Sequence, residues 1–271
     1  EYFGAIEGAS LEANKGAYSY AWMIIFAVIA AIMVLIGLYH IRMLPSNQIP
    51  STTKKTTSEV GRELVVVIAN FFTKKHIFYY ICFIILYRLA EGFIMKIAPL
   101  FLRASREVGG LGLSLKEIGT LNGVFGSAAF VLGSLLAGIY VSKFGLKRTL
   151  FTLCCIFNLP FVAYTFLAVT QPTNVYLIGT CITMEYFGYG FGFVGLTLFM
   201  MQQIAPGKHQ MSHYAFASGI MNLGVMLPGM VSGYFSDLLG YRNFFIYVLI
   251  ATIPAFLITY FIPFTYDDSK K

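Results

Sequence analysis

Apolar runs long enough to cross a membrane dominate this sequence and restrict the folds it can adopt. A membrane-spanning helix needs about 20 mostly apolar residues. Seven runs reach that length: 18–40, 77–102, 118–141, 150–169, 175–201, 214–239 and 244–263. Charged residues make up 11% of the chain, whereas soluble domains are about one quarter charged. We therefore expect an all-α integral membrane protein with seven transmembrane helices.

Composition and motifs exclude several classes of function. The net charge of +7 suits loops that face an anionic leaflet, so it does not indicate nucleic-acid binding. The 190–195 string matches a dinucleotide fingerprint, but it lies in an apolar run, so its glycines predict helix packing or bending. Without a Gly-x-Ser-x-Gly elbow or a His/Asp metal cluster, we do not expect an enzyme. The cysteines lie in apolar runs without metal-ligand spacing, and we expect neither metal nor cofactor: Cys82, Cys154, Cys155 and Cys181.

Lysine and arginine predict the orientation, because cytoplasmic loops carry more of them. With the C-terminus inside, the cytoplasmic set is Arg42, Lys54, Lys55, Arg62, Lys74, Lys75, Lys143, Lys147, Arg148, Lys208, Lys270 and Lys271. The outer set is Lys15, Arg103, Arg106, Lys116 and Arg242. Twelve against five favours a cytoplasmic C-terminus and an outer N-terminus. The chain opens at Glu1 rather than Met, and we expect it to be part of a longer protein.

The connection at 41–76 is the only long loop predicted between the runs. Its second part predicts an amphipathic helix over 57–73 on the cytoplasmic membrane face, because its apolar residues recur at helical spacing. Thr56 and Glu59 have the spacing of a helix-capping box. A plain extension of the next span is the alternative. The predicted divisions are a helix in 1–40, the linker 41–76, a six-helix bundle 77–266 and a tail 267–271.

Two loop strings indicate a family. Ser114 and Glu117 form a second capping box before the third run, which continues into Gly138-Ile-Tyr-Val-Ser-Lys-Phe-Gly-Leu-Lys-Arg148. That string resembles the signature loop of the major facilitator superfamily, with Ser142 at its acidic position. The string 233–242 resembles the turn that leads into the last helix of each six-helix half in that superfamily. The resemblance implies helices 6–12 of a twelve-helix transporter, the last six forming one half. It also implies a gating loop of Gly138, Lys143, Gly145, Lys147 and Arg148.

A narrower resemblance covers about two hundred residues. The stretch 87–95, Tyr-Arg-Leu-Ala-Glu-Gly-Phe-Ile-Met, and Met184-Glu-Tyr186 followed by clustered glycines are similar to AmpG-type muropeptide permeases. That group is related to acetyl-CoA transporters. The resemblance implies a multi-pass symporter of the bacterial inner membrane that imports cell-wall sugar-peptides, driven by protons without a cofactor. Its partners would be a small-molecule substrate, the lipid bilayer and a missing N-terminal half, and no nucleic acid.

Charges inside the apolar runs point to the functional site. Arg88, Glu91 and Lys96 lie in the second run and Glu185 in the fifth, and a charge at mid-bilayer costs about 2.5–3.5 kcal/mol. Counted from the outer helix ends, Glu91 and Glu185 lie at depths within about 2 Å of each other. We predict that one of these carboxyls carries the coupling proton. Arg88 and Glu91 could instead pair locally at i,i+3, and Lys96 could extend to the membrane surface.

Other polar residues are candidates for substrate binding. Arg88 or Lys96 would attract an anionic substrate group, Asn122 and Asn222 would offer hydrogen bonds, and Tyr186 would stack on a sugar. Asparagines in spans more often bridge helices, and aromatic residues more often pack against lipid or neighbouring helices. A seven-helix receptor is the alternative in topology, although no lysine occupies the last run to hold a retinal. A transporter for another organic anion or thioester is the alternative in substrate.

Overall fold

The computed structural model describes residues 14–43 and 56–266 of the chain, in two compact units. The first unit contains one described helix, α1 (Lys15–Met43), in which no residue is buried. Its apolar residues surround the whole helix, which is the pattern of a helix solvated by lipid. The predicted linker residues 44–55 and the tail 267–271 lie outside the described residues.

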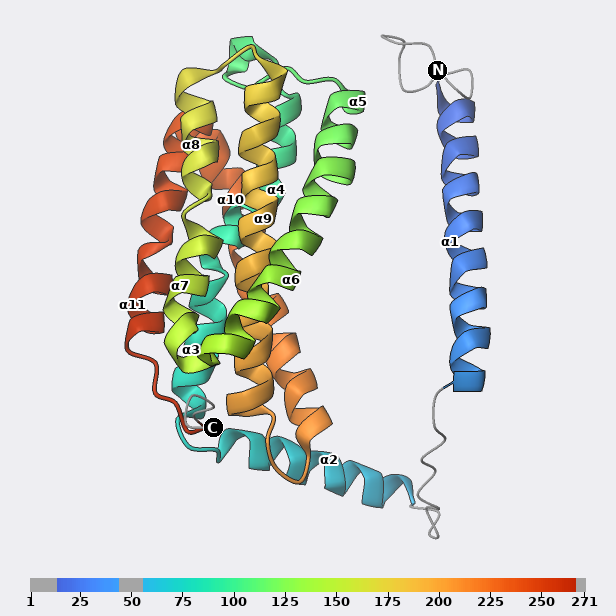
Figure 1. Ribbon diagram of the computed structural model, residues 1–271, viewed down its shortest axis with the longest axis vertical. Coiled ribbons are helices and arrows are strands. Elements are labelled where there is room, and N and C mark those ends of the chain that lie inside the picture. The colour runs from blue at the N-terminus through green and yellow to red at the C-terminus, as the bar shows by residue number, and fades with distance from the viewer. Residues whose placement is uncertain (1–13, 44–55, 267–271) are drawn as a thin grey trace. The chain divides into compact units, whose positions relative to one another are not determined.

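The second unit is a bundle of helices, with α2 lying across one end of it (Figure 1). Its α-helices are α2 (Thr57–Phe72), α3 (Ile77–Tyr87), α4 (Leu89–Arg103), α5 (Leu115–Ile118), α6 (Ser127–Phe144), α7 (Leu146–Asn158), α8 (Phe161–Thr170), α9 (Val175–Phe199), α10 (Gln210–Ala251) and α11 (Ile253–Tyr260). Shorter pieces are the 3₁₀ turn η1 (Arg106–Val108) and the π-helices η2 (Gly119–Gly126) and η3 (Met200–Ile204). The described residues contain no strand.

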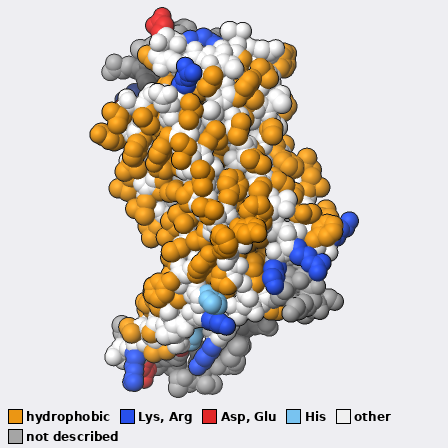
Figure 2. All heavy atoms as spheres, turned by 90° about the vertical axis from the view of Figure 1, so that its left-hand side faces the viewer, with side chains coloured by type: hydrophobic (Ala, Val, Ile, Leu, Met, Phe, Trp, Pro, Cys, Tyr) orange, Lys and Arg blue, Asp and Glu red, His pale blue; other side chains and the backbone are white. Residues whose placement is uncertain are grey.

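Five helices or helix pairs are long and apolar enough to cross a membrane. Among the described residues they are Lys15–Met43, Ile77–Arg103, Leu115–Phe144, Leu146–Thr170 and Gln210–Tyr260. On the face shown in Figure 2, hydrophobic side chains form a broad belt, with Lys and Arg toward the ends of the molecule. The prediction of an all-helical membrane protein is confirmed at this level, because apolar helices need lipid around such a belt.

Two helix breaks coincide with prolines. α7 ends at Asn158 and α8 begins at Phe161, with Pro160 between them. Pro254 lies at the start of α11, directly after the break at Thr252. Proline removes a backbone donor and clashes with the preceding turn, so both breaks have a local cause. Two other prolines, Pro99 and Pro228, lie inside continuous helices.

Gly240 divides α10 into two straight parts. Its φ of 69° and ψ of 161° are not helical, and glycine adopts a positive φ without a steric penalty. An unbroken helix of 42 residues would be about 63 Å long, twice the thickness of a bilayer core of about 30 Å. The turn at Gly240 lets the chain reverse direction at the end of the bundle that lies opposite α2 (Figure 1).

Glycines let α9 pack tightly between two neighbouring helices. A Cβ atom on Gly190 would overlap the Phe130 backbone of α6, and one on Gly133 would overlap the Phe187 backbone of α9. On the other side of α9, Gly192 packs against Phe157 of α7. These contacts confirm that the fingerprint-like string serves helix packing, because only a missing side chain lets two backbones approach so closely.

The helix predicted over 57–73 occupies Thr57–Phe72 and docks on the start of α10. Phe71 is 1% exposed, and its ring lies 5.8 Å from the ring of His213 and 5.7 Å from that of Phe216. His213 Nε2 also lies 3.3 Å from the Val67 carbonyl oxygen of α2. Other apolar side chains of α2 are exposed: Leu64, Val65, Val66, Ile68 and Phe72. Placement of α2 on the cytoplasmic membrane face stays a prediction.

Two polar side chains connect the segments at this end of the bundle. Lys74 donates to the carbonyl oxygens of Ile204 and Pro206, at the end of η3, and partial burial lowers the pKa of its amine. The Gln203 amide accepts from the backbone N–H groups of Thr265 and Tyr266 at 2.9 and 3.0 Å, and donates to the Tyr266 carbonyl at 2.8 Å. The α2–α3 turn and the segment after α11 are therefore both held to η3.

Candidate functional site

Arg88 and Glu91 form a buried ion pair at a helix discontinuity. Arg88 separates α3 from α4 with φ −103° and ψ 6°. Its Nε lies 2.6 Å from one Glu91 carboxylate oxygen and a terminal nitrogen lies 2.5 Å from the other. The two side chains are 6% and 4% exposed, and the guanidinium carbon lies 5.4 Å from the centre of the Phe193 ring. Two-point pairing neutralises both charges away from water, so the i,i+3 pair is the arrangement present in this conformation.

A small cavity brings the two intramembrane carboxyl groups together. Its volume is about 110 Å³. It is lined by Glu91, Ile94, Met95, Ala98, Pro99, Leu102, Asn122, Tyr164, Glu185, Tyr186 and Tyr189. Glu91 comes from α4 and Glu185 from α9, and the two groups lie close enough to interact electrostatically. Four residues that the sequence singles out therefore share one cavity: Glu91, Asn122, Glu185 and Tyr186.

The two carboxyl groups differ in their partners. Glu91 is held by Arg88, and Tyr189 lines the same cavity. Within 14–43 and 56–266, no hydrogen bond or ion pair joins Glu185 to another group. The two carboxyl groups in this cavity therefore differ in countercharge, because Arg88 pairs with Glu91 alone.

Asn122 enters the cavity from the π-helix η2. Its Oδ1 atom is buried and has no hydrogen-bond partner in the described part of the chain. The Tyr186 ring occupies the space beside η2, where a Cβ atom on Gly126 would lie 2.9 Å from it. Buried acceptors are normally satisfied by protein or ordered water, so this oxygen marks a place where a hydrogen-bond donor belongs.

Lys96 and Asn222 lie away from this cavity. Lys96 is exposed, and its aliphatic chain lies along α10, where Cγ would be 3.3 Å from a Cβ atom on Gly229. Asn222 is exposed on α10. Arg88 faces Glu91 and does not line the cavity. Of the five predicted substrate-binding residues, the structure therefore brings only Asn122 and Tyr186 into the cavity.

The predicted gating loop is a tight turn between α6 and α7. Gly145 has φ 77°, a conformation that favours glycine, and Lys143, Lys147 and Arg148 are exposed around it. At Gly138 a Cβ atom would meet nothing within 4 Å among the described residues, so no helix of the described bundle packs closely on this glycine.

Sequence reasoning did not select Tyr164 of the cavity wall, which belongs to α8 and is 4% exposed. Tyr189 of α9, like Tyr186 a candidate for stacking on a sugar, also lines the cavity. The chain contains 18 Tyr and 26 Phe, so Tyr164 does not stand out from its neighbours in the sequence. Only the rotation of each helix within the bundle shows which aromatic residues face the carboxyl groups.

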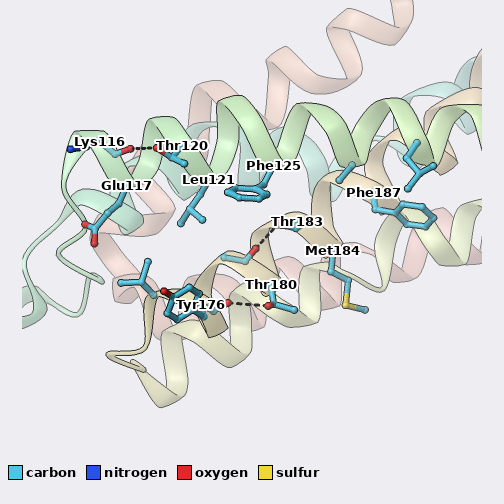
Figure 3. Close-up of a pocket in the computed structure, with 14 residues that line it drawn as sticks. Lys116, Glu117, Thr120, Leu121, Phe125, Tyr176, Thr180, Thr183, Met184 and Phe187 are labelled. Carbon is cyan, nitrogen blue, oxygen red and sulfur yellow. Dashed lines mark hydrogen bonds between the residues drawn. The ribbon is translucent and has the colours of Figure 1, made fainter. Parts of the chain in front are cut away.

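A larger groove lies between the helix that runs from α5 to α6 and the start of α9 (Figure 3). Its volume is about 940 Å³. Leu121 and Phe125 line one side and Met184 the other, while the Thr180 hydroxyl donates back to the Tyr176 carbonyl at 2.9 Å. Its walls are apolar and this hydroxyl is already bonded within its helix. The intramembrane carboxyl groups do not line this groove and lie in the smaller cavity instead.

Comparison with known proteins identifies relatives among transporters. No protein-family model matches the chain. It is 22% identical over 209 residues to the anhydromuropeptide permease of Escherichia coli (strain K12), covering 77% of this chain and 41% of that protein. It is 25% identical over 238 residues to the AmpG 1 transporter of Rickettsia bellii (strain RML369-C), covering 86% and 56%. It is 27% identical over 204 residues to the AmpG 2 transporter of Rickettsia prowazekii (strain Madrid E), covering 73% and 47%.

These matches confirm the resemblance to AmpG-type permeases. The three relatives are named as a permease and transporters, and none of the three is named as an enzyme, which supports the prediction of a transport protein. Together with the apolar helices they support a multi-pass membrane protein. The chain spans between 41% and 56% of the length of these relatives.

Proposed function

We propose that this chain is the C-terminal part of a proton-coupled permease of the bacterial inner membrane, which imports an anionic sugar-peptide such as a muropeptide by alternating access. The observation that carries the proposal is the cavity shared by Glu91 and Glu185, with Arg88 paired to one of them. The substrate class follows the name of the Escherichia coli relative. The proton gradient supplies the energy, and no cofactor takes part.

The proposed architecture is helices 6–12 of a twelve-helix major facilitator fold. The turn at Gly240 separates α10 into two spans, and α9, with 25 residues, is about 37 Å long, which suffices to cross a bilayer. Together with the other four candidate spans this makes seven. In this arrangement 1–40 ends the N-terminal half, 41–76 is the cytoplasmic linker, 77–266 is the C-terminal half and 267–271 is a cytoplasmic tail. The N-terminal half would supply the rest of the site.

Competition for Arg88 would couple the proton to the substrate. While Glu91 is ionised, it occupies the guanidinium group that faces it. A proton that arrives at Glu185 and moves to Glu91 neutralises that carboxylate, which releases Arg88 for an anionic group of the substrate. Loss of the proton to the other side restores the pair and expels the substrate. The Glu91 carboxylate and the anionic substrate group compete directly for Arg88, because a buried cation needs one anionic partner at a time.

The remaining site residues have supporting roles in this proposal. Lys96 and Asn222, which are exposed on α4 and α10, would contact the substrate from the side of the missing half. Asn122 and Tyr186 would bind it from within the cavity. The basic turn around Gly145 would form the cytoplasmic gate, which places the C-terminus in the cytoplasm and the N-terminus outside.

Replacing each acid by its amide tests the proposal. In the full-length protein, Glu91→Gln and Glu185→Gln should abolish the dependence of muropeptide uptake on an imposed pH gradient in membrane vesicles. Glu107→Gln is the matched control, since Glu107 is exposed in η1 outside the cavity. Wild-type dependence on the gradient in both cavity variants would refute the coupling role of these carboxyls.

The same vesicles distinguish the alternative functions. A seven-helix receptor would bind a ligand without accumulating it, so uptake against a concentration gradient excludes that class. A carrier for another organic anion or a thioester would show uptake that excess muropeptide does not inhibit. Competition between labelled muropeptide and each unlabelled class therefore identifies the substrate.

A further inference from the structure

We infer that the carboxyl cavity binds a cluster of about three or four water molecules, held by Asn122, that connects Glu185 to Glu91. Its role in proton movement rests on the proposed function, whereas the hydration itself does not. Asn122 then positions the water cluster between the two carboxyl groups, and this role is separate from any contact with the substrate.

The size of the cavity suits water better than a substrate. Pockets for small organic ligands occupy about 300–1,000 Å³, whereas this cavity has about 110 Å³. One water molecule takes about 30 Å³ in the liquid, so the space corresponds to about three or four. An apolar cavity of this size would stay dry, but a polar one binds water. The decisive question is therefore how many polar groups face it.

Polar groups line several sides of the cavity. The buried Oδ1 of Asn122 has no partner in the described part of the chain, and Glu185 on α9 makes no hydrogen bond there. Tyr186 and Tyr189 supply hydroxyl groups, and Glu91 completes the lining. A buried water needs about three such partners. A cluster of waters satisfies the Asn122 oxygen and the Glu185 carboxyl at the same time.

The backbone around Asn122 also supports a functional role. Asn122 lies inside an eight-residue π-helix that contains three glycines, with the sequence GTLNGVFG. Such π-helical distortions are rare and occur frequently at functional sites. The segment presents Asn122 to the cavity opposite Glu185, from a helix other than those that carry the two acids.

Water would give the two acids a connection that their side chains lack. Glu91 and Glu185 belong to different helices, and no direct hydrogen bond joins them among the described residues. A proton delivered to a cluster of waters from the Glu185 carboxyl can leave it toward the Glu91 carboxylate, so that one O–H bond breaks as another forms. Asn122 accepts a hydrogen bond from the cluster throughout and does not itself change protonation.

Hydroxyl-radical footprinting tests the hydration in the full-length protein. Radicals generated from bound water modify adjacent side chains even when bulk solvent does not reach them. Tyr164 of the cavity wall is 4% exposed, and Tyr80 and Tyr87, which lie outside the cavity, are 1% and 0% exposed. We expect Tyr164 to be modified severalfold faster than the other two, and Asn122→Leu to remove that difference. Equal rates in the wild type would overturn the inference, and this comparison does not depend on any variant folding.

Transport assays test the proton role separately. In Asn122→Leu, uptake driven by a pH gradient should fall at least tenfold, and severalfold further than exchange of labelled for unlabelled substrate at equal pH. Exchange needs substrate binding but no net proton transfer. Parallel loss of both activities would assign Asn122 to substrate binding and overturn the proton role. If the wild-type protein performs neither activity, the proposed function fails and the proton role with it, but the footprinting result still decides whether water is bound.

Discussion

The close packing of α6 against α9 predicts that a single added methyl group lowers the stability of the protein by an unusually large amount. At Gly190, a Cβ atom would lie 2.8 Å from the Phe130 carbonyl carbon and 2.9 Å from its Cα, whereas ordinary contacts begin near 3.4 Å. The same Cβ atom would overlap the Phe130 carbonyl oxygen even more closely. Gly190→Ala therefore forces the two backbones apart by about 1 Å, because backbone atoms cannot rotate away as a side chain can, and a gap of that size loses about half of each dispersion contact along the interface.

The expected loss of stability can be measured against the same substitution at a glycine that has no close neighbour. Overpacking costs about 1–3 kcal/mol, and the better helix propensity of alanine returns about 1 kcal/mol. Gly219→Ala on α10 is the matched control, since a Cβ atom there meets nothing within 4 Å. Both variants share the propensity gain, so the Gly190 variant should be less stable than the Gly219 variant by about 1–3 kcal/mol.

Unfolding in mixed detergent micelles measures this difference. Cys154 is 0% exposed, so its labelling by a maleimide, followed by mass spectrometry, reports the unfolded fraction as the denaturing detergent is increased. The midpoint should move to less denaturant for the Gly190 variant and stay unchanged or rise for the Gly219 variant. Equal midpoints for the two variants would refute the packing role assigned to the α9 glycines.

Further predictions concern polar contacts. Arg88→Met should cost about 3–5 kcal/mol of unfolding free energy, because it leaves the Glu91 carboxylate buried and unpaired. Adding Glu91→Leu should recover most of that loss, and thermal unfolding of the single and double variants checks this. Ser114→Ala should cost about 0.5–2 kcal/mol, because it removes the observed capping box; an unchanged thermal midpoint would contradict this. Gln203→Leu should speed amide hydrogen exchange at 265–266 about tenfold, since each hydrogen bond contributes about 1 kcal/mol, and unchanged exchange would show that the segment is held by packing alone.

Local sequence signals predicted much of the helical framework. The capping box at Ser114, the turn at Gly145 and the helix at Thr57–Phe72 all lie where the sequence places them. These features depend on residues within one turn of each other, so no tertiary information is needed to find them. The presence of charged residues inside apolar runs also identified Glu91 and Glu185, because such residues are costly wherever the helices pack.

Tertiary structure decided how those elements and side chains meet. The π-helix around Asn122 and the break at Arg88 had no local signal in the sequence. The sequence offered the local Arg88–Glu91 pair only as one of two alternatives, and the structure decided between them. The cavity in which Tyr164 faces Glu185 depends on contacts among several helices. The sequence alone determined that this chain forms apolar helices with two acids at similar depth, since lipid leaves every backbone polar group to be satisfied within its own helix. Which faces of those helices touch was decided only by packing, where glycines and small differences in rotation select the neighbours of each residue.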